Sequence, residues 1–413
     1  MRYIQSNPIF YGFTISFHHS KEVFVCCLIV SLRCVFWVGP SIRGGGIDSP
    51  RPASQRAAAL VLTAALLTGA AFPAFADTYY IEDGDITISA GKDGNDVTQN
   101  EKTTYGDKDT VITNQKTDKA SSNTVTINAG NDKVEVTLDN VNIKADSGSA
   151  LISKGDVTLT LKGDNHLTGG NGGSSSYGGD GITSSGSLTI SGGTVTATGG
   201  DSTSSVGSGG SGIYSVSGDV TISGGTVNAN GGDGKNGSGG GSGIDSSGGV
   251  TVSGGTVTAN GGDSKDGSGG NGIYSSGGVT ISSGSTVTAN GGNGEDGSGG
   301  RGITSNGGVT VSGGTVNAKG GSGKNGNGGD GIRSFNPVAI SGGTVNANGG
   351  NSDYSNGGDG IRSLDHVAIS GGTVKSNGGS GNLSGGNGII SYDIDLSGSL
   401  ELTAKAGSPN GKA

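Results

Sequence analysis

The sequence predicts an all-β chain folded as a right-handed parallel β-helix, with three strands in each coil. The first reason is a repeat, because the motif Ser-Gly-Gly-Thr-Val, or once Ser-Gly-Ser-Thr-Val, recurs seven times. Its threonines are spaced by 32, 30, 30, 29, 29 and 29 residues, at positions 194, 226, 256, 286, 315, 344 and 373. The second reason is the composition: 90 of 413 residues are Gly. Without a regular three-residue period this excludes collagen, and the recurring Val, Ile and Thr favour a repeat array over disorder.

One repeat shows how each strand is predicted. In residues 249–275, apolar and polar residues alternate in three short runs, which is typical of strands with one buried face. The side chains expected to point inward are Val250, Val252, Val257, Ala259 and Ile273. Gly pairs separate the runs, where the chain must turn. Successive coils would stack about 4.8 Å apart, and the crossover rule favours the right hand.

Other repeat folds fit less well. Leucine-rich repeats have a similar period, but their Leu and Asn framework is absent. A propeller blade needs four strands, and the calcium-binding β-roll has a nine-residue period that this chain lacks. Outside the regular repeats, residues 134–138 and 157–161 alternate like strands, so we expect shorter coils there.

The chain divides into four predicted regions. Residues 1–50 differ from the rest and are expected to be a spurious or extra leader, or to hold a membrane anchor at 23–38. Residues 51–76 have the basic flank, apolar core and Ala74-Phe75-Ala76 site of a secretory signal, with cleavage expected before Asp77. Residues 77–122 are predicted to cap the first coil, and 123–413 to form the β-helix. The mature chain would then be secreted or held at the cell surface, with no transmembrane span.

The positions of the cysteines and the net charge limit the chemistry and the binding partners expected of the mature chain. All three cysteines, Cys26, Cys27 and Cys34, precede the expected cleavage point, so neither disulfides nor thiol chemistry is expected in the mature chain. The net charge of −9 argues against nucleic acid, whose affinity comes mostly from Lys and Arg. Cations, neutral polymers and acidic polymers bridged by a cation remain as partners.

Equivalent positions of a β-helix stack into columns. The column after Gly-Ile brings Tyr214, Asp245 and Tyr274 into line, with Asn271 beside them. The two tyrosines would be two coils, about 9.6 Å, apart, which is roughly one disaccharide of an extended glucan. These four residues are the candidate carbohydrate contacts; the alternative is ordinary strand surface, where Tyr is favoured by propensity. A column of Asn, including Asn230, is expected to be structural.

The Gly-rich loops between the second and third runs of each repeat are candidate calcium sites. They contain almost nothing apolar, and ordering Gly costs more backbone entropy than any other residue, so packing alone is not expected to fix them. Calcium accepts carboxylates and carbonyls in flexible geometry. The candidate ligands are Asp233, Asp263, Asp266, Glu295 and Asp296. The alternative is a mobile, solvated loop.

Residues 133–170, the Val-Thr-Ile/Val-Ser-Gly-Gly-Thr-Val coils and the Gly-Ile-x-Ser motif together resemble the secreted carbohydrate-binding β-helix proteins of polysaccharide-degrading bacteria. The resemblance covers about residues 123–404. It implies a pectin-lyase-like fold, calcium binding, and binding of cellulose and polygalacturonate without an established lyase reaction. The repeats of this chain are more uniform and richer in Gly than that family's.

The function expected first is therefore non-catalytic binding of an extracellular polysaccharide, assisted by calcium. The second is a polysaccharide lyase or hydrolase, which needs a positioned base beside carboxylates. Its candidate residues are Arg333, Arg362, Asp330, Asp359 and His366, although the repeated Asp–Arg pairs could simply neutralise each other. The third is a structural or adhesive surface rod. Ice binding is disfavoured because the outward Thr columns are interrupted.

Overall fold

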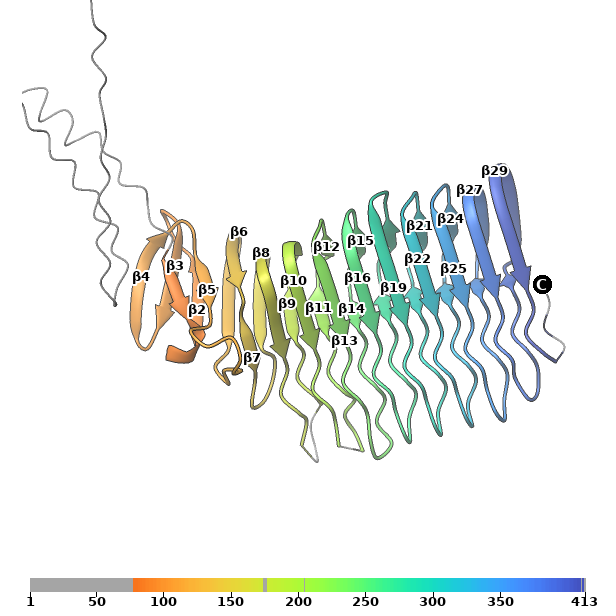
Figure 1. Cartoon of the computed structure of the whole chain (residues 1–413), viewed down its shortest axis with the longest axis horizontal. Helices are drawn as coiled ribbons and strands as arrows, with labels where there is room; N and C mark the ends of the chain where they lie inside the picture. Colours follow the sequence, from red (N-terminus) through yellow and green to blue (C-terminus); the bar gives the residue numbers. More distant parts are fainter. Residues whose placement is uncertain (1–76, 174–176, 204, 410, 412–413) are drawn as a thin grey trace, which may run out of the picture. The chain divides into compact units, whose positions relative to one another are not determined.

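The computed structural model describes residues 77–173, 177–203, 205–409 and 411. The expected leader, signal peptide and cysteines lie outside the described residues. The described chain is a right-handed parallel β-helix, as predicted, in which successive coils stack side by side (Figure 1). No described helix is long and apolar enough to cross a membrane, because the described helical content is one three-residue 3-10 turn.

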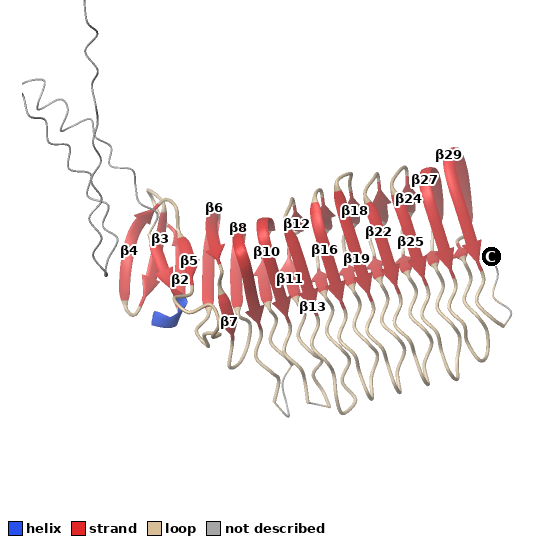
Figure 2. Ribbon diagram, in the orientation of Figure 1, coloured by secondary structure: helices blue, strands red, loops and turns tan. Residues whose placement is uncertain are grey.

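Each regular coil contains three strands, and one long loop follows the third strand (Figure 2). The first face, which follows each Gly-Ile step, is formed by β9 (Ile182–Ser185), β11 (Ile213–Ser217), β14 (Ile244–Ser246), β17 (Ile273–Ser275), β20 (Ile303–Ser305), β23 (Ile332–Ser334), β26 (Ile361–Ser363) and β28 (Ile389–Ile390). The second face holds β12 (Val220–Ile222), β15 (Val250–Val252), β18 (Val279–Ile281), β21 (Val309–Val311) and β24 (Val338–Ile340). The third face holds β13 (Thr226–Asn230), β16 (Gly255–Asn260), β19 (Ser285–Asn290), β22 (Thr315–Lys319) and β25 (Thr344–Asn348).

Longer strands run across two or three faces at either end of the stack. These are β6 (Val125–Asp139), β8 (Leu151–Thr168), β10 (Leu188–Thr198), β27 (His366–Asn377) and β29 (Asp393–Lys405), with the short β7 (Asn142–Lys144) between β6 and β8. Val134 pairs with Val157 in parallel register, which confirms the early strands expected at 134–138 and 157–161.

Residues 77–122 form a different arrangement. They contain β1 (Thr78–Tyr80), the 3-10 turn η1 (Ile81–Asp83), β2 (Ile86–Ala90), β3 (Asn95–Gln99), β4 (Lys102–Asp107) and β5 (Val111–Thr113). β3 pairs antiparallel with both β2 and β4, and β2 also pairs in parallel with β6. The antiparallel hairpins therefore lie next to the first parallel coil, at the end of the stack that Figure 1 colours orange.

The register of the parallel strands is continuous. On the first face, eleven inward residues pair in succession, one from each coil: Ile86, Val125, Leu151, Ile182, Ile213, Ile244, Ile273, Ile303, Ile332, Ile361 and Ile389. On the third face, Val257 and Ala259 stack on their counterparts in the same way. All five inward residues predicted from residues 249–275 are fully buried. Burial of this column supplies the hydrophobic stabilisation that no single coil could reach.

A second inward column consists of serine. The Ser of the Gly-Ile-x-Ser motif is buried in seven coils, and in all of these except that of Ser334 its hydroxyl donates to a backbone carbonyl, as Ser305 does to Gly277 (3.0 Å) and Gly308 (2.7 Å). Both carbonyls also accept a backbone N–H group, from Gly307 (2.7 Å) and Val279 (2.9 Å) respectively. The serine hydroxyl is thus a second donor to each carbonyl, and these bonds satisfy the buried hydroxyl itself, which gives the column a structural reason.

The Gly-rich loops are held by hydrogen bonds between their own backbone groups rather than by side-chain packing. Each loop leaves the third face through one Gly pair, such as Gly261-Gly262, and returns through another, such as Gly269-Gly270. The Gly270 N–H donates to the Gly262 carbonyl, and the Gly262 N–H donates to the Gly241 carbonyl of the preceding coil, both at 2.8 Å. The same zigzag continues through the coils, so the loops are as regular as the strands (Figure 2).

Side chains are excluded from this double layer of loops. A Cβ placed on any of Gly261, Gly262, Gly269 and Gly270 would overlap a backbone carbonyl of a neighbouring segment. The flanking residues Asn260, Asp263, Ser268 and Asn271 carry their side chains on the outer surface, so side chains appear at every third position. A period of three is that of the polyproline II conformation. We call this part of each coil the glycine layer.

Candidate functional site

A polar trough crosses four coils on the returning side of the glycine layer. Its floor is glycine backbone, and its volume is about 310 Å³. One side carries Asn327 and Asn356 with neighbouring serines. The other side carries the charged residues Arg301, Asp330, Arg333, Asp359 and Arg362. We call this hollow the arginine trough; because its groups repeat from coil to coil, it suits an extended ligand.

The two aspartates hold the arginines in place. Asp330 and Asp359 are only 7% and 5% exposed. Oδ2 of Asp330 lies 3.4 Å from Arg301 Nε and 3.7 Å from Arg333 Nη1, and Oδ2 of Asp359 lies 3.2 Å from Arg362 Nη1. Their Oδ1 atoms accept from the backbone N–H groups of the following coil, Asp359 at 2.9 Å and Asn387 at 2.7 Å. The carboxylates are therefore fixed on both sides.

Burial and neighbouring charge shift the pKa values in this trough. Burial raises the pKa of the Asp330 carboxyl above its ordinary range. Burial, and then the charge of Arg301, lower the pKa of the Arg333 guanidinium. Among the described residues, Nε of Arg333 and Nε of Arg362 are buried atoms without a hydrogen-bond partner. Three arginines face two aspartates, which leaves one positive charge (3 − 2 = 1) uncompensated in the trough.

An aromatic recess adjoins the trough through Arg301. It has a volume of about 470 Å³ and is lined by Asn271, Tyr274, Arg301, Thr304, Asn306 and Phe335. The Tyr274 hydroxyl accepts from the Asn306 amide at 3.1 Å, and the Arg333 guanidinium lies 5.2 Å from the centre of the Phe335 ring. The recess therefore combines two aromatic rings with hydrogen-bonding groups.

Of the four predicted carbohydrate contacts, Tyr274 and Asn271 line this recess. Tyr214 and Asp245 lie in the same column, in the two preceding coils, as the stacking predicted: Tyr214 pairs with Asp245 and Asp245 with Tyr274. All four residues are half-buried rather than fully exposed. Burial, with a smaller contribution from the charge of Asp180, raises the pKa of Asp245 to about 6.

Four of the five candidate catalytic residues line the arginine trough, and His366 does not. The stacking of Arg333 on Arg362 is confirmed by the register of β23 and β26, and both Asp330 and Asp359 lie beside them. His366 is not among the residues that line the arginine trough. It follows the corner after β26, and its Nδ1 lies 3.4 Å from Asp365. His366 begins β27 on the second face, so the other four candidates line the trough and His366 does not.

The predicted calcium ligands are spread along the loops, and four of the five have other partners. Oδ1 of Asp233 accepts from the N–H of Asp263 (2.9 Å), and Oδ1 of Asp263 accepts from the N–H of Asn293 (2.6 Å). These carboxylates therefore supply acceptors to loop N–H groups that have no carbonyl opposite them. The side chains of neighbouring coils thus form a ladder that ties each loop to the next.

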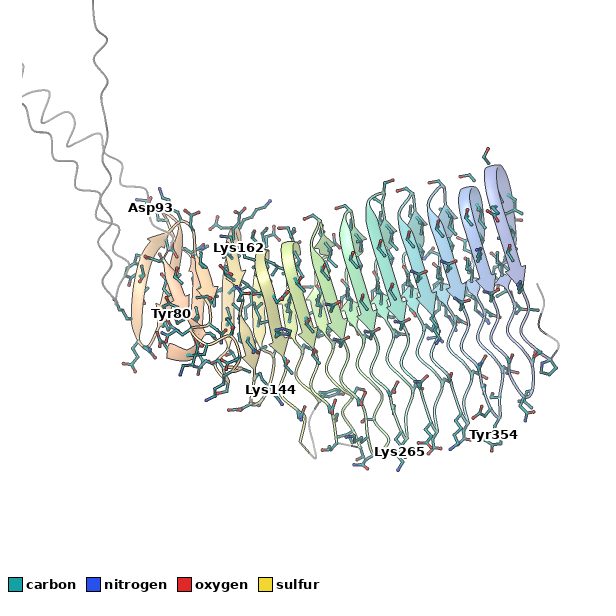
Figure 3. All side chains as sticks on the ribbon, viewed as in Figure 1. Tyr80, Asp93, Lys144, Lys162, Lys265 and Tyr354 are labelled. Atoms are coloured by element: carbon teal, nitrogen blue, oxygen red, sulfur yellow. The ribbon has the colours of Figure 1, made fainter. Side chains whose placement is uncertain are left out.

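The remaining three candidates lie near the loop tips, on the side where Figure 3 labels Lys265 and Tyr354. Glu295 pairs with Lys324 at 2.9 Å, and Asp296 accepts from Asn325 at 2.7 Å. Asp266 is exposed. Within the described residues, no three Asp, Glu, His or Cys side chains converge as metal ligands would. The five residues do not fit a single shared calcium site.

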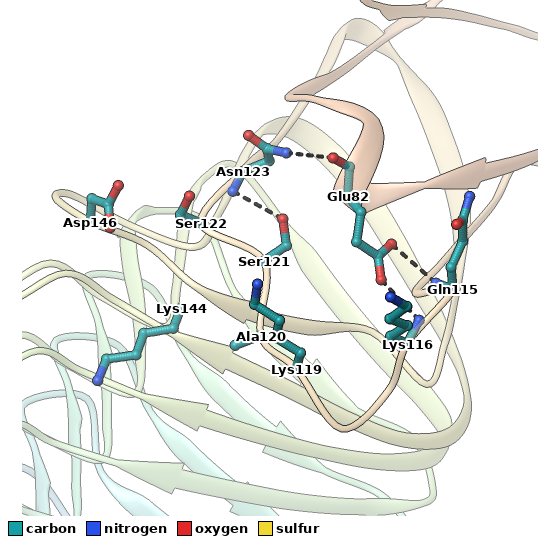
Figure 4. Close-up of a pocket in the computed structure, with 10 residues that line it drawn as sticks. All are labelled: Glu82, Gln115, Lys116, Lys119, Ala120, Ser121, Ser122, Asn123, Lys144 and Asp146. Atoms are coloured by element: carbon teal, nitrogen blue, oxygen red, sulfur yellow. Dashed lines mark hydrogen bonds between the residues drawn. The ribbon is translucent and has the colours of Figure 1, made fainter.

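Two further hollows were not predicted. One, of about 700 Å³, follows the outgoing side of the loops and carries Lys235, Lys265 and Lys324 among acidic side chains. The other, of about 560 Å³, lies where residues 77–122 meet the early coils (Figure 4). There Glu82 accepts from the backbone N–H groups of Gln115 (3.1 Å) and Lys116 (3.0 Å), so its carboxylate holds this segment together.

Sequence reasoning missed Arg301, Asn327 and Asn356 as members of the trough. Arg301 was visible in the same column as Asp330 and Asp359. The two asparagines precede Gly pairs, and only the three-residue period of the glycine layer shows that they face the arginines.

A family model described as a β-helix repeat matches residues 188–212, 220–245, 250–272 and 338–361. Neither curated proteins nor solved structures gave a match. The matched segments run from the second face through the glycine layer, which identifies the chain as a protein with repeats similar to those of the β-helix repeat family.

Proposed function

We propose that this protein binds an extracellular polysaccharide without cleaving it, with the polymer lying along the stack in the arginine trough and the aromatic recess. The observation that carries the proposal is the repetition of equivalent polar groups across successive coils of the trough. The coil spacing of about 4.8 Å is close to the length of one sugar residue. A small compact ligand would use only part of such a surface.

The chemistry of the two hollows favours an acidic polymer. Arg guanidinium groups donate paired hydrogen bonds to carboxylates, and the uncompensated positive charge favours an anionic ligand. Tyr274 and Phe335 offer flat apolar surfaces for the faces of sugar rings. The buried aspartates fix the positions of the arginine side chains through salt bridges. The guanidinium donors are therefore in place before a ligand binds.

Calcium was expected to bridge the protein to acidic sugars. The carboxylates of the loops are shared between backbone and lysine partners, so the proposal assigns the acidic groups of the polymer to the arginines. Calcium-assisted binding remains the alternative, and a chelator distinguishes the two. Binding that survives chelator supports the arginines, and binding that disappears supports a bridging cation.

The test is a pull-down of the purified protein with polygalacturonate and with cellulose, each with and without chelator. We expect the unmodified protein to be retained on polygalacturonate. The double variant Arg333→Gln with Arg362→Gln should lose at least tenfold in affinity for this polymer. The control Lys265→Gln, at a loop tip, should bind with unchanged affinity. Circular dichroism of each variant checks the fold. Equal binding by the arginine variant would overturn the proposal, and absence of binding to any polysaccharide would favour a structural or adhesive rod.

A polysaccharide lyase is the second candidate, because the lowered pKa of Arg333 is what a base at this position needs. Two observations count against it: Arg333 and Arg362 both lie within salt-bridge distance of an aspartate, and the Asp–Arg pair occurs in two successive coils. Release of unsaturated product from polygalacturonate, followed by its ultraviolet absorbance, would establish the lyase. Loss of that activity in Arg333→Lys would assign the base.

Secretion is part of the proposal, because a polysaccharide ligand of this kind is extracellular. The signal peptide expected at 51–76 predicts that the exported protein begins at Asp77. N-terminal sequencing of the exported protein tests this point. A first residue well before Asp77 would contradict the expected cleavage.

A further inference from the structure

Asp245 lies between two tyrosines on the first face of the stack. In the column that follows each Gly-Ile step, Tyr214 pairs with Asp245 and Asp245 pairs with Tyr274. The three side chains therefore follow one another at the coil spacing of about 4.8 Å. All three are half-buried, so the carboxylate is flanked by two aromatic side chains and remains accessible to a ligand.

The Asp245 carboxylate holds no other described group in place. Its neighbour Asp180, by contrast, accepts from the Thr183 hydroxyl and from the Ser211 N–H, both at 2.7 Å. No group in the described ranges donates a hydrogen bond to the Asp245 carboxylate. Burial raises the pKa of this carboxyl, so its charged form destabilises the folded protein. A residue that lowers stability and has no partner within the protein is typical of a binding site.

An organic ammonium group suits this site. An ammonium donates charge-assisted hydrogen bonds to a carboxylate and is attracted to the faces of aromatic rings. A metal ion is disfavoured because it needs several oxygen ligands, and no three Asp, Glu, His or Cys side chains converge in the described part of the chain. In a polysaccharide, the free amino group of an amino sugar supplies such an ammonium.

The positive charges of the arginine trough lie further along the same column. Thr304 follows Tyr274, and Arg333 and then Arg362 follow Thr304 in unbroken register. Asp245 and Arg333 are three coils apart, about 14 Å, which is roughly the length of three sugar residues. We propose that the polysaccharide bound along this column carries free amino groups as well as carboxylates, with an ammonium at Asp245 and a carboxylate at Arg333. This inference rests on the proposed function, which supplies the contact at Arg333.

A polymer in which uronate and amino sugar alternate fits this spacing. Residues three apart in such a polymer are always of opposite kind, so an ammonium beside Asp245 brings a carboxylate to Arg333. A purely acidic polymer can occupy the arginine trough, but it gains nothing from Asp245. The column therefore selects for a ligand that carries both charges.

The experiment compares two matched oligosaccharides of alternating glucuronate and glucosamine, one with free amino groups and one fully N-acetylated. Their affinities are measured by isothermal titration calorimetry at pH 7. We expect the oligosaccharide with free amino groups to bind at least tenfold more tightly. Asp245→Asn should remove this difference, because the amide carries no charge. The control Asp266→Asn, exposed at a loop tip, should keep it, and circular dichroism of each variant checks the fold.

Retention on polygalacturonate is measured with the same preparations, so that the two proposals can fail separately. The inference alone is overturned if polygalacturonate is retained while the two oligosaccharides bind equally or not at all. It is also overturned if Asp245→Asn weakens both oligosaccharides alike, because Asp245 would then contact a sugar hydroxyl. Loss of binding to polygalacturonate and to both oligosaccharides would overturn the proposed function together with the inference.

Discussion

Substitution of Gly270 by Ala tests whether the glycine layer holds the coils together. A Cβ at this position would overlap the carbonyl oxygen of Gly241 in the preceding coil and lie 2.5 Å from its carbonyl carbon. Neither backbone can move away alone, because the Gly270 N–H donates to Gly262 and the Gly270 carbonyl accepts from Gly292, both at 2.8 Å. The coil spacing must therefore open at this point.

The expected cost follows from these contacts. Forcing one methyl group into a packed site costs roughly 1–3 kcal/mol, and each lost hydrogen bond adds about 1 kcal/mol. The sum is roughly 3–5 kcal/mol of local unfolding free energy. Because repeat arrays can unfold in parts, we would measure it by hydrogen exchange of the loop peptides as well as by chemical denaturation.

Gly224→Ala is the matched control. Its Cβ would meet nothing within 4 Å, so we expect no loss of stability. Faster exchange should be confined to the loops next to Gly270 in the Gly270→Ala variant. Unchanged exchange and an unchanged denaturation midpoint would refute the close packing of the loops.

The other predictions concern single side chains. Asp263→Ala should lose about 1 kcal/mol because Asn293 loses its acceptor, whereas Asp263→Asn should keep most of the stability; equal denaturation midpoints for the two variants would contradict the ladder. The pKa of Asp245 is raised from 3.8 to about 6, so folding disfavours its charged form and wild-type stability falls as pH rises through this window. Asp245→Asn should therefore stabilise the protein at pH 7, by about 3 kcal/mol at most, but not at pH 4, and Asp266→Asn should do neither in the same thermal melts. Ser305→Ala should cost about 1 kcal/mol in chemical denaturation, because the hydroxyl bonds to two carbonyls are lost while both carbonyls keep their backbone donors. The hydroxyl of Ser334 has no partner among the described residues, so Ser334→Ala should be neutral, and equal losses in both serine variants would contradict the hydrogen-bonding role.

The strands could be predicted from sequence because each inward position repeats a Val, Ile or Ala at a fixed spacing. The same regularity predicted the columns: Asn260 donates to Asn230 at 2.9 Å, and Asn290 donates to Asn260 at 2.9 Å. The structural role expected for the Asn column is thereby confirmed. In these cases a side chain interacts with the same position one coil away, so the repeat alone defines the contact.

The loops could not be predicted in this way, because their contacts join two different positions of neighbouring coils through backbone atoms. From sequence alone, Gly262 represents only an entropic cost, whereas the structure shows that the absence of a Cβ lets the loops approach one another. The backbone partners of the Asp233 and Asp263 carboxylates are likewise not evident from sequence, because they lie in the next coil. The pattern of one side chain followed by two glycines has the three-residue period of polyproline II, and this period would have indicated that the loops are regular.

Equal coil length has a consequence for how such a chain changes over generations. From Thr286 to Thr373 the repeat is 29 residues each time. Deleting or duplicating one such block would rejoin equivalent positions and keep the buried valines in line. The length of the stack is thus free to vary by whole blocks. Coils of 30 and 32 residues keep the same strand register, so the loops also accommodate one to three extra residues.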